Sequence, residues 1–294
     1  MADKRYVTGG WTPDGRRIIP AVGVTEPMSL SEKAGYPEGR AVLREALITQ
    51  RHRFVDMLAA LPAEGWGQAS RCAGWSVHDV ARHVRDGALM HVALLAGRQL
   101  PYNSERFDPR RTPDEWLART KGAAPAETLN DLRRLAGEEA ELLVTAGGDR
   151  LWTGALRRKQ HPSTWSTHVF WDAWIHEADV AAPLGLPVRR SRLDLQVAVL
   201  YGLLVAAEPA ARTGDYVNTV VRLDGSPSEA YRIAHDADHD DIIVTALPGA
   251  DAALHGEVFA VLDSLCGRGP TLEKVLDGAA SVTRRLSLLR AVAT

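Results

Sequence analysis

The chain has 294 residues, of which 45% are hydrophobic and 24% charged, and its formal net charge is −2. This balance predicts a globular protein of one large domain or two ordinary ones, and it excludes the strongly basic surface of a nucleic-acid binder. No apolar run approaches the roughly 18 residues of a membrane span, no signal-peptide core is evident, and two distant cysteines make no disulfide framework, so we expect no membrane or nucleic-acid partner and a cytoplasmic location.

Residues 1–38 are predicted to form an N-terminal arm, because they are rich in Gly and Pro and show no helical periodicity. A partly disordered tail fits the same residues. After the arm, apolar residues recur with a period near 3.6 residues in segments that end at Pro or Gly. Helices are therefore expected at about 39–61, 76–97, 126–146, 162–184 and 190–207, with a shorter helical region opening at 112.

From about residue 214 the pattern changes to short β-branched runs between turn residues, at 216–223, 231–234 and 242–247. An amphipathic helix is expected at 251–265, a short strand at 275–276 and a last helix at 279–292. We place the boundary between an all-helical part and a small α/β part near residue 212. The predicted organisation is then an arm (1–38), a helical domain (39–212) and an α/β domain (213–294).

The stretch 168–179, HVFWDAWIHEAD, carries the chemistry. His168, Asp172, His176 and Asp179 follow one another at spacings of four, four and three, so they share one face of a helix. The other faces carry large apolar side chains, which predicts that the helix is buried. Buried His and Asp side chains must be paired or bound to an ion. Asp172 and His176 can reach one point beside the helix, which makes them half of a metal site.

His83, on the edge of the apolar stripe of the helix at 76–97, is the candidate for the missing ligand. Facing helices of a bundle can build a metal site in the core. Two imidazoles and one carboxylate leave a coordination position open, which is the catalytic arrangement. Zinc is the first choice, although such ligands suit other divalent ions. The alternative is that these residues are satisfied polar groups in a core, with His168 a competing ligand or a supporting partner and Asp179 a capping or pairing residue.

Two other features are interpreted as structural. Cys72 is expected to be a small buried apolar side chain rather than a nucleophile. The acidic run 236–241, DADHDD, is expected to be a solvated turn rather than a metal site.

Three segments together resemble a known family. Residues 72–83, CAGWSVHDVARH, resemble one signature of the mycothiol-dependent maleylpyruvate isomerase family, within the DinB-like superfamily of metal-dependent thiol enzymes. Residues 174–179, WIHEAD, followed by the PLG of 183–185, resemble its second signature. The tail resembles the family's sterol-carrier-like C-terminal domain at 255–258, 265–268 and 277–278. The match runs in order over about 40–290.

The resemblance implies a DinB-like four-helix bundle followed by a small sterol-carrier-like α/β domain. It also implies a divalent metal, usually zinc, held by the matches to His83, Asp172 and His176, although the family carries Glu where this chain has Asp172. The family's C-terminal domain contributes an arginine to the active site, and Arg268 is the nearest match. The arm and the segment 149–161 have no counterpart in the family.

The function implied by the resemblance is that of an enzyme using mycothiol as a thiol nucleophile on a small electrophilic molecule. We expect S-transfer or thiol exchange, because DinB-like folds host many thiol transfers and the chain departs from the isomerase at its arm and at Asp172. The alternatives are a mycothiol-dependent cis–trans isomerase of the maleylpyruvate type, a non-catalytic metal- or thiol-binding regulator, and a metal-free scaffold. The protein is expected to be a monomer or homodimer.

Overall fold

A computed structural model of the chain describes residues 16–19, 24–27, 36–98, 111–145, 152–153, 159–160, 162–211, 213–236 and 241–287. By their contacts these residues divide into two compact units. The helical unit consists of the described residues within 40–148 and 168–194. The sheet unit consists of the other described residues, most of them within 195–294. The predicted boundary near residue 212 stays a prediction.

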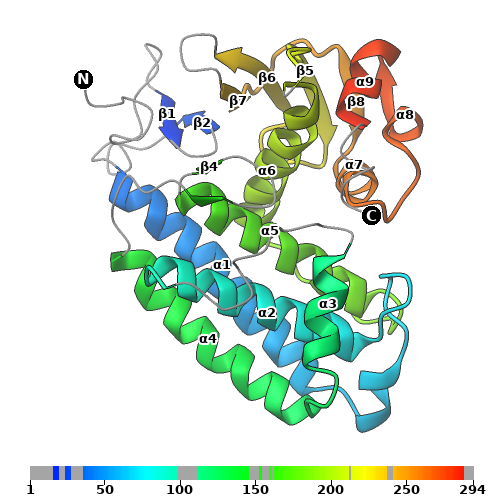
Figure 1. The fold of residues 1–294 in the computed structure, drawn as a ribbon. Helices are drawn as coiled ribbons and strands as arrows, with labels where there is room; N and C mark the ends of the chain where they lie inside the picture. The colour runs from blue at the N-terminus through cyan, green and yellow to red at the C-terminus, as the bar shows by residue number, and fades with distance from the viewer. Residues whose placement is uncertain are drawn as a thin grey trace. The chain divides into compact units, whose positions relative to one another are not determined.

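The helical unit is built mainly from four long helices (Figure 1). The helices of the unit are α1 (Tyr36–Ala59), the 3-10 helix η3 (Ala63–Gly67), α2 (Val77–Leu95), α3 (Thr112–Arg119), α4 (Pro125–Thr145) and α5 (Pro162–Ala181). The bounds of the long helices agree with the predicted ones to within a few residues, because their apolar stripes are regular and Pro or Gly ends them. The capping box that opens α2 pairs Ser76 with Asp79 in both directions.

One hydrophobic core is shared by the four long helices of this unit. It contains buried side chains from α1, α2, α4 and α5, among them Phe54, Leu58, Val80, Leu132 and Ala173. These side chains fix α2 beside α5, because each helix presents its apolar face to the same interior. The polar faces that α2 and α5 turn toward one another are therefore set by the packing of the core.

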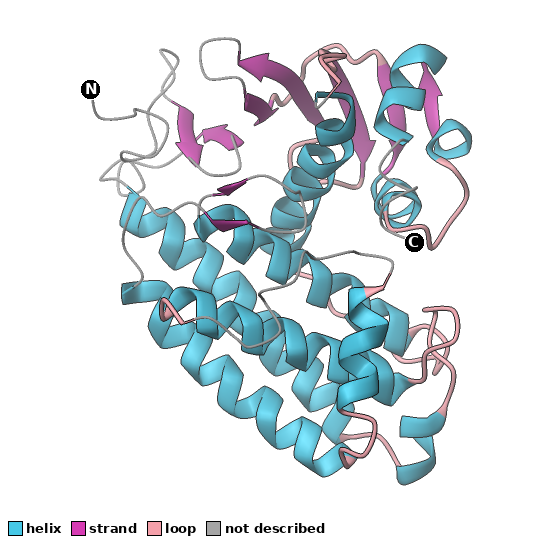
Figure 2. Ribbon diagram, in the orientation of Figure 1, coloured by secondary structure: helices cyan, strands magenta, loops and turns pink. Residues whose placement is uncertain are grey.

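The sheet unit contains a seven-stranded sheet with the order β1-β2-β7-β6-β5-β8-β9. Its strands are drawn in magenta in Figure 2. Neighbouring strands are antiparallel except for β2 with β7 and β5 with β8. The strands are β1 (Arg16–Ile19), β2 (Val24–Pro27), β5 (Thr219–Asp224), β6 (Ala230–Asp236), β7 (Asp241–Ala246), β8 (Leu254–Glu257) and β9 (Leu276–Gly278), and the helices of the unit are α6 (Arg192–Ala211), α7 (Val258–Leu265), α8 (Leu272–Val275) and α9 (Ala280–Ser287). A separate two-stranded sheet joins β3 (Trp152–Thr153) to β4 (Lys159–Gln160).

Two predictions for these segments were wrong or incomplete. The helix expected at 251–265 begins only at Val258, because its first part forms the strand β8. Gly256 shows why: a Cβ there would lie 2.5 Å from the carbonyl oxygen of Val275, a close approach that only glycine permits. The arm, for which no strands were predicted, contributes β1 and β2 to the sheet. Residues 237–240 of the acidic run and 288–292 of the last predicted helix lie outside the described residues.

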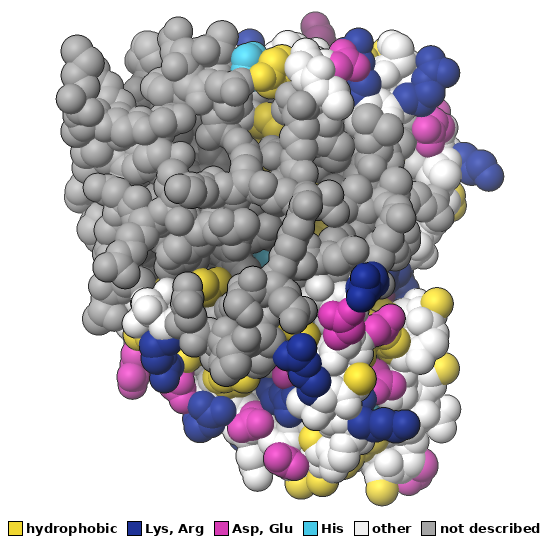
Figure 3. Space-filling model, in the orientation of Figure 1, with side chains coloured by type: hydrophobic (Ala, Val, Ile, Leu, Met, Phe, Trp, Pro, Cys, Tyr) yellow, Lys and Arg dark blue, Asp and Glu magenta, His cyan; other side chains and the backbone are white. Residues whose placement is uncertain are grey.

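The described surface carries both signs of charge. On the face that Figure 3 shows, Lys and Arg side chains lie interspersed with Asp and Glu side chains over the helical unit, in keeping with the formal net charge of −2. Among the described residues, no helix combines the length and the apolar character that crossing a membrane requires.

Candidate metal centre

The packing of α2 against α5 brings His83, Asp172 and His176 together. The Nε2 atom of His83 lies 3.5 Å from Oδ2 of Asp172, and Nε2 of His176 lies 3.6 Å from Oδ1 of the same carboxylate. The two imidazole rings meet edge to face, with centroids 4.8 Å apart. Each of the three residues offers one ligand atom, and these atoms all lie within 4.8 Å of one another. The three side chains therefore converge on one point, as the sequence predicted.

These separations fit the ligands of one ion better than they fit hydrogen bonds. A nitrogen–oxygen hydrogen bond spans about 2.7–3.2 Å, so the distances of 3.5 and 3.6 Å are too long. Two ligand atoms at tetrahedral angles, each about 2.0–2.1 Å from a zinc ion, lie about 3.3 Å apart. The donor set of two imidazole nitrogens and one carboxylate is also one that zinc takes. The residues present thus fit a divalent ion.

Asp179 supports His176 from its far side. Its Oδ2 atom accepts a hydrogen bond of 2.9 Å from Nδ1 of His176 and one of 3.1 Å from Sγ of Cys72, while its Oδ1 atom lies 3.6 Å from Nε of Arg71. Asp179 is fully buried. A carboxylate that accepts the Nδ1 proton fixes the imidazole tautomer and leaves the Nε2 lone pair directed at the ion. Asp179 therefore pairs rather than caps, and it orients the candidate ligand.

His83 has no comparable partner. Its Nδ1 atom is buried, and it has no hydrogen-bond partner among the described residues. Asp86, three residues further along α2, is held through Oδ1 by Nε and Nη2 of Arg85, and its Oδ2 atom is likewise buried without a hydrogen bond. The ring of His83 instead packs against the indole of Trp75, with centroids 5.1 Å apart. The two candidate imidazole ligands thus differ in how they are held.

The local charges favour a cation at the point of convergence. Burial acts against the ionised Asp172 carboxyl, but the neighbouring His83 and His176 outweigh it and hold the pKa of Asp172 far below its usual value. Burial likewise acts against protonated His176, yet Asp172 and the hydrogen bond to Asp179 raise the pKa of His176 to about 10. The carboxylates therefore stabilise a positive charge at this site.

His168 is not among the converging groups. Among the described residues, the clusters able to hold an ion are His83–Asp172–His176 and a second one, Cys72–His176–Asp179. Burial lowers the pKa of His168, which leaves the ring neutral at neutral pH. The second cluster engages the Nδ1 side of His176, and Cys72 is buried there, as predicted, but donates to Asp179 rather than packing only as an apolar side chain.

Part of the chain matches a known protein family. Residues 47–181 match the family described as the mycothiol maleylpyruvate isomerase N-terminal domain. These residues belong to that family. The match spans both α2 and α5, from before His83 to beyond Asp179, and it confirms the resemblance found in the sequence.

Two solved structures share the fold. The crystal structure of the mycothiol-dependent maleylpyruvate isomerase has a TM-score of 0.54 and 16% sequence identity, and that of a histidine-to-alanine mutant of this isomerase has a TM-score of 0.53 and the same identity. In both cases the match covers 83% of this chain and 92% of the other. A search of curated proteins by sequence found no match. The mixed architecture of helices and a small sheet is therefore shared with the isomerase over most of both chains.

Asp172 departs from the glutamate expected in the maleylpyruvate isomerase family, yet it still reaches both imidazoles. Its two carboxylate oxygens face different rings, Oδ2 toward His83 and Oδ1 toward His176. The side chain is also 28% exposed, whereas that of His176 is 8% exposed. The shorter carboxylate therefore keeps its place in the cluster and forms its most accessible member.

Arg268, the family's candidate catalytic arginine, belongs to the sheet unit and follows α7. Its Nη1 atom donates a 2.7 Å hydrogen bond to the carbonyl oxygen of Cys266, and its backbone N–H donates to the carbonyl oxygen of Asp263. These contacts hold the Gly-Arg turn in shape. A catalytic role for Arg268 stays a prediction.

Sequence reasoning missed Trp75 and Asp114, which lie beside the cluster. The indole of Trp75 lies 5.1 Å from the His83 ring and 6.3 Å from the His176 ring, and its N–H donates to Asp114. Trp75 lies within the segment 72–83 that resembles the family signature, and Asp114 lies in the helical region that opens at 112. No spacing rule connects the two, because they are 39 residues apart.

Proposed function

We propose that the chain is a metal-dependent enzyme that uses mycothiol as its thiol cosubstrate and catalyses a cis–trans isomerisation of the maleylpyruvate type. The observation that carries the proposal is the convergence of His83, Asp172 and His176 within a domain of the isomerase family. The S-transfer expected from the sequence has less support, because the domain match and both solved structures bear the name of the isomerase.

The same proposal includes the fold of each domain, the identity of the metal, the domain limits, the oligomeric state and the location. The helical unit is taken as a DinB-like four-helix bundle, the C-terminal part as a sterol-carrier-like domain, and the metal as zinc. The domain limits 39–212 and 213–294, a monomeric or homodimeric state and a cytoplasmic location complete it. These are expectations from the sequence.

The chemistry needs a thiolate at neutral pH. His83, Asp172 and His176 would hold the divalent ion, which would supply a lowered thiol pKa and so a thiolate at neutral pH. The thiolate sulfur adds to one carbon of an activated double bond, the resulting single bond rotates, and loss of the same thiolate restores the double bond. No atom is gained or lost, so the cosubstrate is regenerated.

The residues of the chain orient the candidate ligands and set the electrostatic potential of the site. Asp179 holds His176 in one tautomer, as its 2.9 Å contact with Nδ1 indicates. Asp172 adds the negative charge that would favour a bound cation beside His83 and His176. Arg268 is proposed to bind a carboxylate of the substrate, for which a guanidinium is a bidentate donor.

The test uses the purified full chain with mycothiol and a cis-configured unsaturated dicarboxylate such as maleylpyruvate. We expect about one divalent ion per chain by elemental analysis and conversion of cis to trans substrate without net consumption of mycothiol. His176→Ala is expected to lose both the ion and the turnover. His78→Ala is the matched control, because His78 pairs with Thr128 and packs against Trp66 outside the cluster.

Other results would select the alternatives. Accumulation of a mycothiol conjugate, seen as an increase in mass, would replace isomerisation by S-transfer. A stoichiometric ion without turnover would favour a binding or regulatory protein. A chain without metal, whose melting temperature does not respond to a chelator, would be a scaffold and would refute the proposal.

A further inference from the structure

Trp75 lies against both imidazoles of the candidate metal centre. It occupies the turn just before α2, and its ring is tilted by 51° to that of His83 and by 30° to that of His176. The centroid distances of 5.1 and 6.3 Å are those of packed aromatic rings. The indole therefore covers one side of the pair of histidines.

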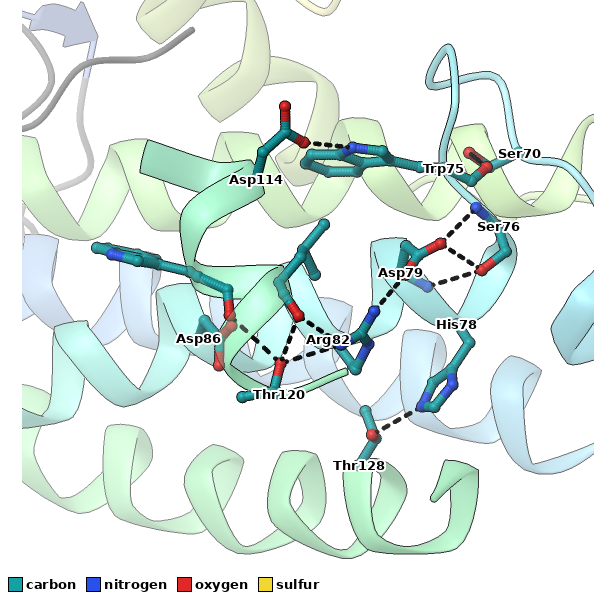
Figure 4. A network of polar contacts seen from close by, with 12 residues as sticks. Ser70, Trp75, Ser76, His78, Asp79, Arg82, Asp86, Asp114, Thr120 and Thr128 are labelled. Atoms are coloured by element: carbon teal, nitrogen blue, oxygen red, sulfur yellow. Dashed lines mark hydrogen bonds and ion pairs between the residues drawn. The ribbon is translucent and has the colours of Figure 1, made fainter. Parts of the chain in front are cut away.

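Two sets of hydrogen bonds fix the position of Trp75. Its backbone N–H donates to the carbonyl oxygen of Cys72, and its carbonyl oxygen accepts from the N–H and hydroxyl of Ser70. Its indole N–H donates a 3.0 Å hydrogen bond to Oδ1 of Asp114 in the first turn of α3 (Figure 4). The backbone is thus held by its own turn, and the ring is held by a helix 39 residues away in sequence.

The helix that carries Asp114 is itself tied to α2. Arg82, next to His83 in the sequence, is buried, and its Nη1 atom donates to the carbonyl oxygen of Leu117 and to Oγ1 of Thr120 at the end of α3. Arg82 also pairs with Asp79, the capping residue of α2. Figure 4 shows this line of contacts from Ser76 through Asp79 and Arg82 to Thr120. Both ends of α3 are therefore anchored, the first turn to Trp75 and the last to Arg82 of α2.

The two histidines differ in what holds their rings, and this difference indicates the role of Trp75. Asp179 orients His176 by a hydrogen bond, but the Nδ1 atom of His83 is buried without one. What limits the rotation of the His83 ring on this side is its packing against the indole. An indole free to swing would release the ring and admit water to the ion, which weakens charge interactions by raising the local dielectric.

We propose that Trp75, held by Asp114, is a positioning residue that keeps the His83 and His176 rings in their converging orientation and shields the cluster from water. Asp114 acts only through Trp75. The metal-dependent half of the proposal rests on the proposed function, whereas the orientation of the rings can be measured in the metal-free protein.

Four single variants and one double variant separate the contribution of the Asp114 acceptor from that of the Trp75 indole. Asp114→Ala removes the acceptor, Asp114→Asn keeps an acceptor oxygen, and Trp75→Phe keeps a ring but removes the N–H. Glu115→Ala is the matched control, because it removes a neighbouring carboxylate of α3 whose ion pair is with exposed Arg111. The double variant joins Trp75→Phe to Asp114→Ala.

The measurements are the rate at which zinc leaves the full chain, followed with a chromophoric chelator in excess, and the imidazole NMR signals of His83 and His176 in metal-free protein. We expect Asp114→Ala and Trp75→Phe each to speed zinc loss by about three- to tenfold, less than the loss from removing a direct partner of a ligand. The double variant should be no faster than the larger single effect, because both changes break the same hydrogen bond. The rate of zinc loss from Asp114→Asn should stay within about twofold of that of the unchanged protein. The rate from Glu115→Ala should equal that of the unchanged protein.

The outcomes distinguish this proposal from the proposed function. If the unchanged protein binds no zinc, the proposed function fails, and the NMR signals decide the positioning role: they should move in Asp114→Ala and Trp75→Phe but not in Glu115→Ala. If Asp114→Ala behaves as Glu115→Ala in both measurements, or if the effects of Trp75→Phe and Asp114→Ala add fully, the positioning role of the pair is refuted.

Discussion

At the scale of single residues, the two histidines of the cluster are supported by different means. The Nδ1 atom of His176 is held by a buried carboxylate that also engages Cys72 and lies near Arg71. The Nδ1 atom of His83 has no hydrogen bond, and its ring depends on aromatic packing. A hydrogen bond to a carboxylate fixes both tautomer and direction, whereas packing fixes direction alone. We therefore expect His176 to be the ligand whose support matters most for affinity.

Asp179→Asn tests this expectation. The amide removes the negative charge and can present an NH2 group to Nδ1 of His176, which favours the tautomer that carries its proton on Nε2, where the ion should bind. We expect zinc affinity to fall by about 10- to 100-fold, as for other supporting partners of metal ligands. Competition with a chromophoric chelator measures the affinity, and Asp131→Asn, a change at a partly exposed carboxylate of α4 that pairs with Arg134, serves as the control. An affinity within about twofold of the unchanged protein would contradict the orienting role of Asp179.

At the scale of elements, α1, α2 and α4 each contribute one residue to a second buried polar cluster, made of Arg51, His91 and Glu139. The carboxylate of Glu139 accepts hydrogen bonds from Nε and Nη2 of Arg51, and one of its oxygens lies 2.9 Å from Nδ1 of His91. All three side chains are fully buried. Burial opposes the ionised carboxylate, but Arg51 and His91 more than offset it and lower the pKa of Glu139 to about 2. The cluster joins one residue from each of the three helices.

This cluster predicts a pH-dependent stability. Because the pKa of Glu139 is about 2 in the folded chain and near 4.5 when unfolded, its contribution is complete above about pH 4.5 and is lost as the pH falls toward 2. The shift corresponds to roughly 3 kcal/mol of unfolding free energy. Urea unfolding at pH 6, 4 and 3 should show this loss in the unchanged chain.

Glu139→Gln is the informative variant for the acid range. It should be less stable at pH 6, because it leaves the guanidinium of Arg51 buried without its charge partner, and it should lose less stability on acidification. Equal acid sensitivity of the two proteins would show that other carboxylates account for the loss.

The elements also show what the sequence could predict. The long helices were predictable because apolar residues keep a 3.6-residue period and Pro or Gly closes each segment. The shared face of Asp172 and His176 on α5 was predictable from their spacing, and His83 was a candidate from its place at the edge of the apolar stripe of α2. That the three residues bind a metal stays a prediction. Strand β8 was missed because its four residues continue into the amphipathic pattern of α7 and only the close approach at Gly256 separates the two. The strands of the arm were missed because four residues each are too few to show a period.

The supporting contacts could not be predicted in the same way. The contact of Trp75 with Asp114 joins residues that no local pattern relates, and the charge cluster of Arg51, His91 and Glu139 joins three helices. Such contacts depend on the angles at which helices pack, which follow from the whole core and not from one segment. The exception is the pair His176 and Asp179, since three residues along a helix is a spacing at which side chains meet.

At the scale of the whole molecule, the residues named in the proposed function occur in both units. The three converging ligand residues belong to the helical unit, whereas Arg268, the arginine proposed to bind the substrate carboxylate, belongs to the sheet unit. Loss of Arg268 should therefore leave metal binding unchanged and lower only the turnover of substrate. A single variant should then keep its metal content while its turnover falls.

Arg268→Ala provides that separation. A guanidinium that holds a carboxylate in the reacting complex typically contributes a charge-assisted hydrogen bond of about 1.5–3 kcal/mol, so kcat/KM should fall by roughly 10- to 150-fold. Zinc stoichiometry and dissociation rate should remain those of the unchanged chain. Arg268→Lys should recover only part of the activity, because an ammonium cannot form the bidentate contact. Arg284→Ala, an exposed change on α9 of the same unit, is the control. Full activity in Arg268→Ala would assign the substrate carboxylate to another cation, and loss of zinc together with activity would place the effect in folding and not in substrate binding.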